Sequence, residues 1–144
     1  MLNKLGAGRF RAFSAGSDPK GAVHPLALKK LVRLGVPTEG LASKHWNVFA
    51  APDAPGMDFI CAVYDSAAGE TCPEWPGRFA AHWDLADPAA VEGTDAQKET
   101  AFSTAARYLR NRIAVFLSLP LRSLNELVHE ARLRESGGAS RTVL

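Results

Sequence analysis

The sequence has few cysteines, little net charge and no long apolar run, and each shortage excludes a class of protein. Its two cysteines, Cys61 and Cys72, are too few for a disulfide scaffold and favour a reducing, cytoplasmic location. A net charge of +2 argues against a dedicated nucleic-acid binder. The most apolar stretch, residues 113–121, contains Ser118 and Pro120 and is shorter than the roughly 20 residues of a membrane span. No apolar run of about 7–15 residues follows the first residue, so we expect no secretory signal.

The composition is that of one globular domain. The chain has 144 residues, of which 47% are hydrophobic, and this fraction is too high for a disordered protein. A short Gly- and Ser-containing stretch begins after Ser136. We therefore expect one domain over residues 1–136 and a flexible tail over residues 137–144.

Three segments have the hydrophobic pattern of strands. In residues 9–15 polar and apolar side chains alternate, and a Gly/Ser/Asp/Pro cluster follows. Residues 57–64 are almost continuously apolar, which is typical of a parallel strand buried on both faces. Residues 78–83 form a shorter candidate of the same kind. Helical segments separate these strands, which indicates an α/β layered domain with a mainly parallel sheet.

Helix start and stop signals lie between and after the strands. Pro25 suits the first position of a helix that Gly35 ends. A second helix is predicted over residues 43–49 with Ser43 as its cap. A capping box at residues 123–126 begins a terminal helix that reaches about Ser136.

The strongest helix signal begins with the capping box Thr94 to Gln97. Apolar residues then recur at steps of three and four, which places them on one face. These residues are Phe102, Ala106, Leu109, Ile113 and Phe116. Pro120 is expected to stop or kink this helix.

No HExxH, CxxC, GxGxxG or Walker motif is present, so no metal or nucleotide site is predicted. Two loops follow predicted strands, where ligands bind in open α/β sheets. Residues 14–21 begin with Ser14, and spacing alone favours a simple turn made by Gly and Pro. Residues 64–73 place Cys72 in a Gly-containing loop. A loop thiol can take part in thiol exchange, but taken alone Cys72 is more typical of a bystander, and Cys61 is expected in the core.

A third loop, residues 82–88, offers a general acid. Asp87 precedes Pro88 and is therefore held out of the helical region, so its carboxyl group can project into a cleft. Asp84 is an equal candidate on chemistry alone. The alternative is a solvated loop carboxylate.

The residue patterns of the three loops, and their order along the chain, resemble those of the arsenate reductases built on the low-molecular-weight protein tyrosine phosphatase fold. The pattern Ser-Ala-Gly-Ser-x-Pro-Lys-Gly occurs at residues 14–21. The pattern Cys-Asp-x-Ala-Ala-x-Glu-x-Cys-Pro is approximated by residues 64–73, and His-Trp-x-x-x-Asp-Pro-Ala-Ala is matched from His82 to Ala90. The resemblance covers nearly the whole chain.

The resemblance implies reduction of arsenate to arsenite, as in arsenic detoxification. In such enzymes the Cys of a Cys-x5-Arg phosphate loop attacks arsenic, an Asp protonates the departing oxygen, and a second Cys releases arsenite. By position Asp87 is the general acid and Cys72 the redox-loop cysteine, while Ser14 and His24 support the site. The implied reductant is a thiol from thioredoxin, glutaredoxin or glutathione, and no bound cofactor is expected.

Two departures from the family pattern predict an inactive chain. The resemblance places the phosphate loop and its strand before Met1, so we expect residues 1–144 to lack the nucleophilic Cys, the oxyanion nest and the Arg clamp. Tyr64 also replaces the first cysteine of the redox loop, and a tyrosine cannot exchange thiols. His24 stands where the family often has Asn, either touching an active-site loop or simply starting a surface helix.

Two other functions stay open. A low-molecular-weight tyrosine phosphatase usually has an aromatic residue after Asp-Pro, where this chain has Ala89. A non-catalytic relic would bind a partner, or a second copy that supplies a strand.

The resemblance also predicts the arrangement of the sheet. It implies a three-layer fold with strand order 2-1-3-4, in which the first, central strand is missing. Residues 10–14, 59–64 and 78–83 would be strands 2, 3 and 4. An empty slot would leave strands 2 and 3 about 10 Å apart, with unpaired backbone groups that invite another chain.

Overall fold

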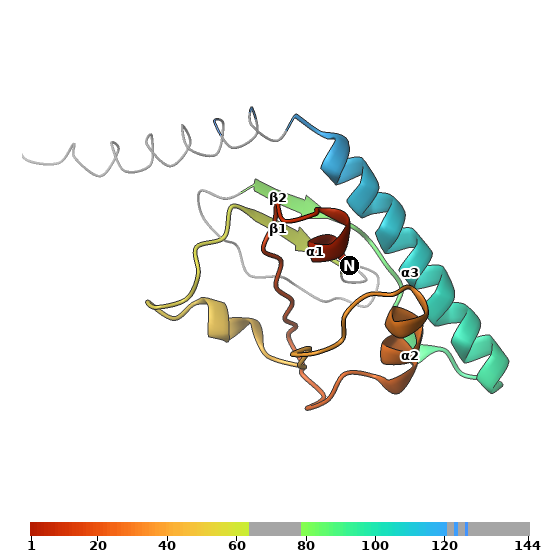
Figure 1. Cartoon of the computed structure of the whole chain (residues 1–144). Helices are drawn as coiled ribbons and strands as arrows, with labels where there is room; N and C mark the ends of the chain where they lie inside the picture. The colour runs from red at the N-terminus through yellow and green to blue at the C-terminus, as the bar shows by residue number, and fades with distance from the viewer. Residues whose placement is uncertain (64–78, 121–122, 124–125, 127–144) are drawn as a thin grey trace, which may run out of the picture. The chain divides into compact units, whose positions relative to one another are not determined.

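The computed structural model describes residues 1–63, 79–120, 123 and 126 (Figure 1). The chain divides into two compact units. The first comprises Met1–Pro55 and Leu85–Leu117, and the second comprises Gly56–Asp84 and Ser118–Leu144. Ser123 and Glu126 are helical, as expected for the terminal helix. The rest of that helix, the boundary at residue 136 and the tail lie outside the described residues and stay predictions.

The second unit contains a parallel sheet of two strands, β1 (Phe59–Ala62) and β2 (Phe79–His82). Phe59 pairs with Phe79 and Ala62 with His82, and the Trp83 N–H extends the ladder to the Ala62 carbonyl at 2.7 Å. The two apolar segments were predicted as parallel strands, and this is confirmed. The burial of β1 is less complete than predicted, because each of its residues is only half-buried.

The predicted strand at residues 9–15 is wrong. Residues 10–15 have no regular secondary structure, and only an isolated parallel bridge joins Gly16 to His45. An alternating pattern becomes a strand only when another strand lies alongside, and here the Asn3 side chain takes that place at Ala12. Within the described residues the segment does not pair with β1, whose ladder partner is β2. The three-layer arrangement and the missing central strand stay predictions.

The first unit contains two short helices joined by a lysine. Helix α2 (Pro25–Arg33) begins at the predicted proline and is followed by Gly35, whose positive φ of 63° suits glycine. Lys4, in α1 (Leu2–Leu5), donates from Nζ to the carbonyls of Leu34 and Gly35 at 2.8 and 2.9 Å. A cation at the carbonyl end of a helix is favourable, so this contact fastens α1 to α2.

The predicted helix at residues 43–49 is shorter and has a different cap. A 3₁₀ turn, η1 (Trp46–Phe49), begins after His45, whose Nδ1 accepts the Asn47 N–H at 3.1 Å. Ser43 was expected to cap this element, but its Oγ accepts the Lys20 N–H at 3.0 Å. A long-range hydrogen bond has therefore replaced the local one.

Helix α3 (Asp95–Ser118) confirms the strongest helix prediction. The Thr94 N–H donates to Gln97 Oε1 at 2.8 Å and the Gln97 N–H donates to Thr94 Oγ1 at 3.3 Å, which is the reciprocal pattern of a capping box. The helix ends two residues before Pro120, as predicted.

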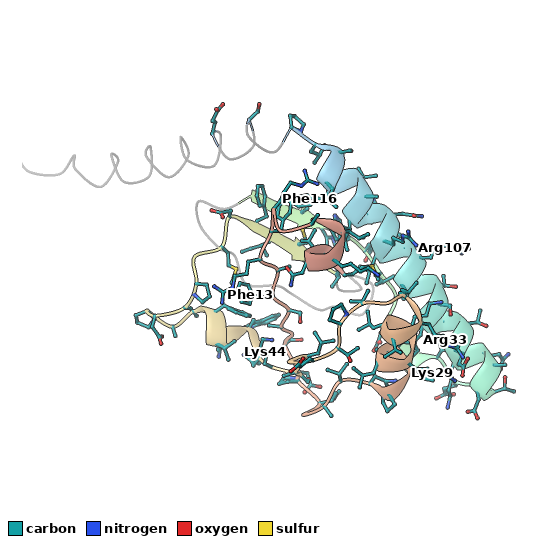
Figure 2. All side chains as sticks on the ribbon, viewed as in Figure 1. Phe13, Lys29, Arg33, Lys44, Arg107 and Phe116 are labelled. Atoms are coloured by element: carbon teal, nitrogen blue, oxygen red, sulfur yellow. The ribbon has the colours of Figure 1, made fainter. Side chains whose placement is uncertain are left out.

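The apolar face of α3 supplies most of the buried residues of the first unit. The buried hydrophobic residues are Val36, Phe102, Ala105, Ile113 and Phe116. Ala105 is buried in place of the predicted Ala106, which is half-buried together with Leu109. The Phe10 ring lies 5.5 Å from that of Phe116. On the surface, Lys29 and Arg33 of α2 form ion pairs with Glu99 of α3 (Figure 2).

Candidate active site

The loop of residues 14–21 is fastened to the chain just before η1. The Gly16 N–H donates to the Lys44 carbonyl at 3.0 Å, and the Trp46 N–H donates to the Gly16 carbonyl at 3.1 Å. The hydrogen bond from the Lys20 N–H to Ser43 holds the far end of the loop. Ser14 is exposed at its start. Hydrogen bonds from its backbone therefore fix the position of this loop.

Lys20 and Asp18 form a pair of opposite charges on the loop. The ammonium of Lys20 pairs with the exposed carboxylate of Asp18, and this hydrogen bond lowers the pKa of Asp18 and raises the pKa of Lys20. The negative charge of Asp87 adds a smaller contribution that also raises the pKa of Lys20. Asp87 and the 14–21 loop, far apart in the sequence, thus lie within electrostatic reach of each other.

Asp87 has the backbone conformation that its proline neighbour predicts. Its φ of −66° and ψ of 112° are extended, and its Oδ1 accepts the Ala89 N–H at 2.8 Å at the start of the 3₁₀ turn η3 (Pro88–Ala90). The residue is exposed. The carboxylate is therefore held in one place by a local cap while staying open to solvent, an arrangement compatible with both a general acid and a solvated loop carboxylate. Asp84 is also exposed and follows β2.

His24 has a structural role at the start of α2. Its Nδ1 accepts the Leu26 N–H at 3.2 Å, and its ring stacks on Phe102 with the centroids 4.6 Å apart. The ring therefore couples the start of α2 to the core face of α3. Of the two interpretations of His24, these contacts favour the helix-start residue.

We expect His24→Ala to lower the free energy of unfolding by about 1–2 kcal/mol, because both the cap and the ring contact are lost. His24→Asn keeps an acceptor for the Leu26 N–H and should recover part of this loss. Urea unfolding followed by circular dichroism measures both values. An unchanged midpoint in His24→Ala would contradict the structural role.

Of the two cysteines, Cys61 is among the described residues and Cys72 is not. Cys61 lies in β1, and burial raises the pKa of its thiol. Cys72 and Tyr64 lie outside the described residues, so the redox role of Cys72 stays a prediction.

We expect iodoacetamide to alkylate Cys61 several-fold more slowly in the folded chain at pH 8 than in the chain unfolded by guanidinium. The reason is that only the thiolate reacts, and burial disfavours the thiolate. Mass spectrometry of the Cys61 peptide over time measures the two rates. Equal rates would show that the thiol is accessible and ordinary.

The sequence contains a Cys-x5-Arg spacing at residues 72–78, although the resemblance places the phosphate loop before Met1. Cys72 and Arg78 are separated by five residues, two of which are Pro73 and Pro76. A phosphate loop binds its oxyanion through consecutive backbone N–H groups and the N-terminus of the next helix. The two prolines lack that N–H, and Arg78 is followed directly by strand β2. The spacing alone therefore does not make an oxyanion site.

The described part of the chain contains neither a metal-binding cluster nor a membrane-spanning helix. No three or more His, Cys, Asp or Glu side chains gather there in a way that could hold a metal ion. No helix among those residues has both the length and the apolar character needed to cross a membrane.

Comparison with known proteins gives a likeness at the level of the fold. No protein-family model matches the chain, and neither does any curated protein sequence. Among solved structures, an arsenate reductase in its reduced state matches with a TM-score of 0.55 and 24% sequence identity. The match covers 80% of this chain and 83% of that one. The chain has an arsenate reductase-like fold. This agrees with the arsenate reductase resemblance of the three loops, while the low-molecular-weight phosphatase type of the fold stays a prediction.

Proposed function

We propose that this protein is an arsenate reductase-like protein in which Asp87 acts as the general acid. The observation that carries the proposal is the fold likeness to an arsenate reductase. The small effect of the Asp87 charge on the pKa of Lys20 is compatible with it, because this effect involves two of the three family-like loops. The third loop contains Cys72, to which we assign the role of redox thiol.

The chemistry of arsenate reduction assigns separate tasks to these groups. Arsenate gains two electrons from two thiols, which become a disulfide, and one of its oxygens leaves as water. Asp87 would supply a proton to that oxygen, and its open, capped carboxyl group suits this task. Cys72 would supply one thiol, and thioredoxin, glutaredoxin or glutathione would supply reducing equivalents. Such thiols stay reduced in the cytoplasm, which is the location that we propose.

Residues 1–144 by themselves are proposed to be inactive. Their Cys-x5-Arg segment lacks two N–H donors, and Tyr64 occupies the place of a redox cysteine. Ser14 and His24 would support the site only indirectly, through the loop and the start of α2.

The decisive experiment adds the strand and the phosphate loop that the family resemblance implies. The chain is extended at its N-terminus by a strand and a Cys-x5-Arg loop, and NADPH-linked thioredoxin oxidation is followed with arsenate as substrate. We expect arsenate binding and slow reduction, and a further loss of about 10²–10⁴-fold in Asp87→Asn. Asp84→Asn is the matched control and should keep the rate.

Two results would contradict this assignment. Faster hydrolysis of p-nitrophenyl phosphate than reduction of arsenate would favour a tyrosine phosphatase instead. Full thioredoxin-coupled turnover in the extended Cys72→Ser protein would show that Cys72 is not the redox thiol.

A further inference from the structure

Residues 11–15 belong to no sheet and run as an extended coil that leads to the Gly16–His45 bridge (Figure 1). On one side, both backbone groups of Ala12 bond the Asn3 side-chain amide, at 2.7 and 3.2 Å. On the same side, Gly16 exchanges two backbone bonds with Lys44 and Trp46. Residues four apart share an edge in an extended chain, so these contacts define a closed edge.

The opposite edge carries the N–H and C=O groups of Arg11, Phe13 and Ala15, because successive residues of an extended chain alternate between the two edges. All three residues are exposed. Within the described part of the chain, none of their backbone groups has a hydrogen-bond partner. An exposed row of such groups is a template for an added strand.

Two cations lie over the aromatic rings beside this segment. The Arg11 guanidinium lies 5.1 Å from the centroid of the Phe13 ring, which is 5.4 Å from the ring of Phe49. The Lys44 ammonium lies 5.9 Å from the centroid of Phe49 (Figure 2). Among the described residues, no carboxylate pairs with Arg9, Arg11 or Lys44. The edge thus combines free backbone groups with uncompensated cations.

We propose that residues 11–15 are a docking edge for an extended, acidic segment of a partner protein, which adds alongside them as a β-strand. Backbone hydrogen bonds would give the register, and a carboxylate would pair with Arg11. Single-stranded nucleic acid fits less well, because cations already lie over the rings of Phe13 and Phe49 on which bases would stack. A second copy fits less well, because pairing would bring the cations of both edges together.

The test uses the whole chain and a fluorescein-labelled peptide of alternating Glu and Val. Fluorescence anisotropy measures binding, and amide NMR locates it. We expect saturable binding that weakens as salt is raised, with the largest shifts at the amides of Arg11, Phe13 and Ala15. The same peptide with Lys in place of Glu should bind at least about tenfold more weakly.

Variants separate the charge from the backbone groups. Arg11→Glu should weaken binding about tenfold, whereas Arg107→Glu on the exposed surface of α3 should not. Ala15→Pro removes an N–H from the open edge and should weaken binding about three- to tenfold. Ser14→Pro is the matched control, because it removes an N–H from the closed edge.

Several outcomes would overturn the proposal. One is that the Glu and Lys peptides bind with the same affinity. Another is that Ala15→Pro and Ser14→Pro weaken binding equally. A third is that oligothymidine binds as tightly as the Glu peptide. Dimers in sedimentation that Ala15→Pro dissociates would identify a second copy as the occupant instead. Circular dichroism reports whether each variant keeps its helices. If Ala15→Pro does not fold, a peptide N-methylated at alternate amides tests the same hydrogen bonds, and unchanged binding of that peptide would reject the added strand.

Discussion

Neither arsenate nor p-nitrophenyl phosphate is expected to be turned over by the purified 144-residue chain above the rate in buffer. A general acid such as Asp87 contributes about 10²–10⁴-fold, but only where a nucleophile and an oxyanion site are present. The Cys72 to Arg78 segment contains two prolines where a phosphate loop needs N–H donors.

Thioredoxin-coupled NADPH oxidation and release of p-nitrophenol measure the two activities. An established arsenate reductase assayed in parallel is the positive control. Turnover of either substrate that disappears in Asp87→Asn would show that the chain already contains a working site, and the expected inactivity would be wrong.

The largest loss of stability is expected for Phe116→Ala. Phe116 is only 4% exposed and packs against the ring of Phe10, so removing its side chain leaves a cavity in a small core. Such a change typically lowers the free energy of unfolding by about 3–5 kcal/mol, a large part of the total for a domain of this size.

Urea unfolding followed by circular dichroism at 222 nm measures this loss. Val115→Ala is the matched control, since Val115 is the preceding residue of α3 and is 62% exposed. Its unfolding midpoint should move little. Equal losses in the two variants would mean that the inward face of α3 has been assigned incorrectly.

The elements that the sequence predicts correctly are those whose signals are local. The capping box at Thr94 and Gln97 satisfies itself within one helical turn, and Pro25 and Gly35 act through their own backbone preferences. The extended conformation of Asp87 follows from the ring of Pro88 in the same way. Each of these needs no information from elsewhere in the chain.

The elements that the sequence predicts wrongly depend on partners far along the chain. Residues 9–15 have the composition of a strand, but a strand also needs a neighbour, and their closed edge is taken by a side-chain amide. Ser43 has the side chain of a good helix cap, but its hydroxyl oxygen accepts the Lys20 N–H instead. The small effect of the Asp87 charge on the pKa of Lys20 relates two loops that are far apart in the sequence, and no local pattern predicts it.

The contact between Asn3 and Ala12 also has a consequence for chain entropy. It spans nine residues, whereas the contact between Lys4 and Leu34 spans 30. Loop closure scales with the logarithm of loop length, so the shorter closure costs about 1 kcal/mol less in conformational freedom. The contact between α1 and Ala12 therefore costs little chain entropy, and it does not depend on the contact between α1 and the end of α2.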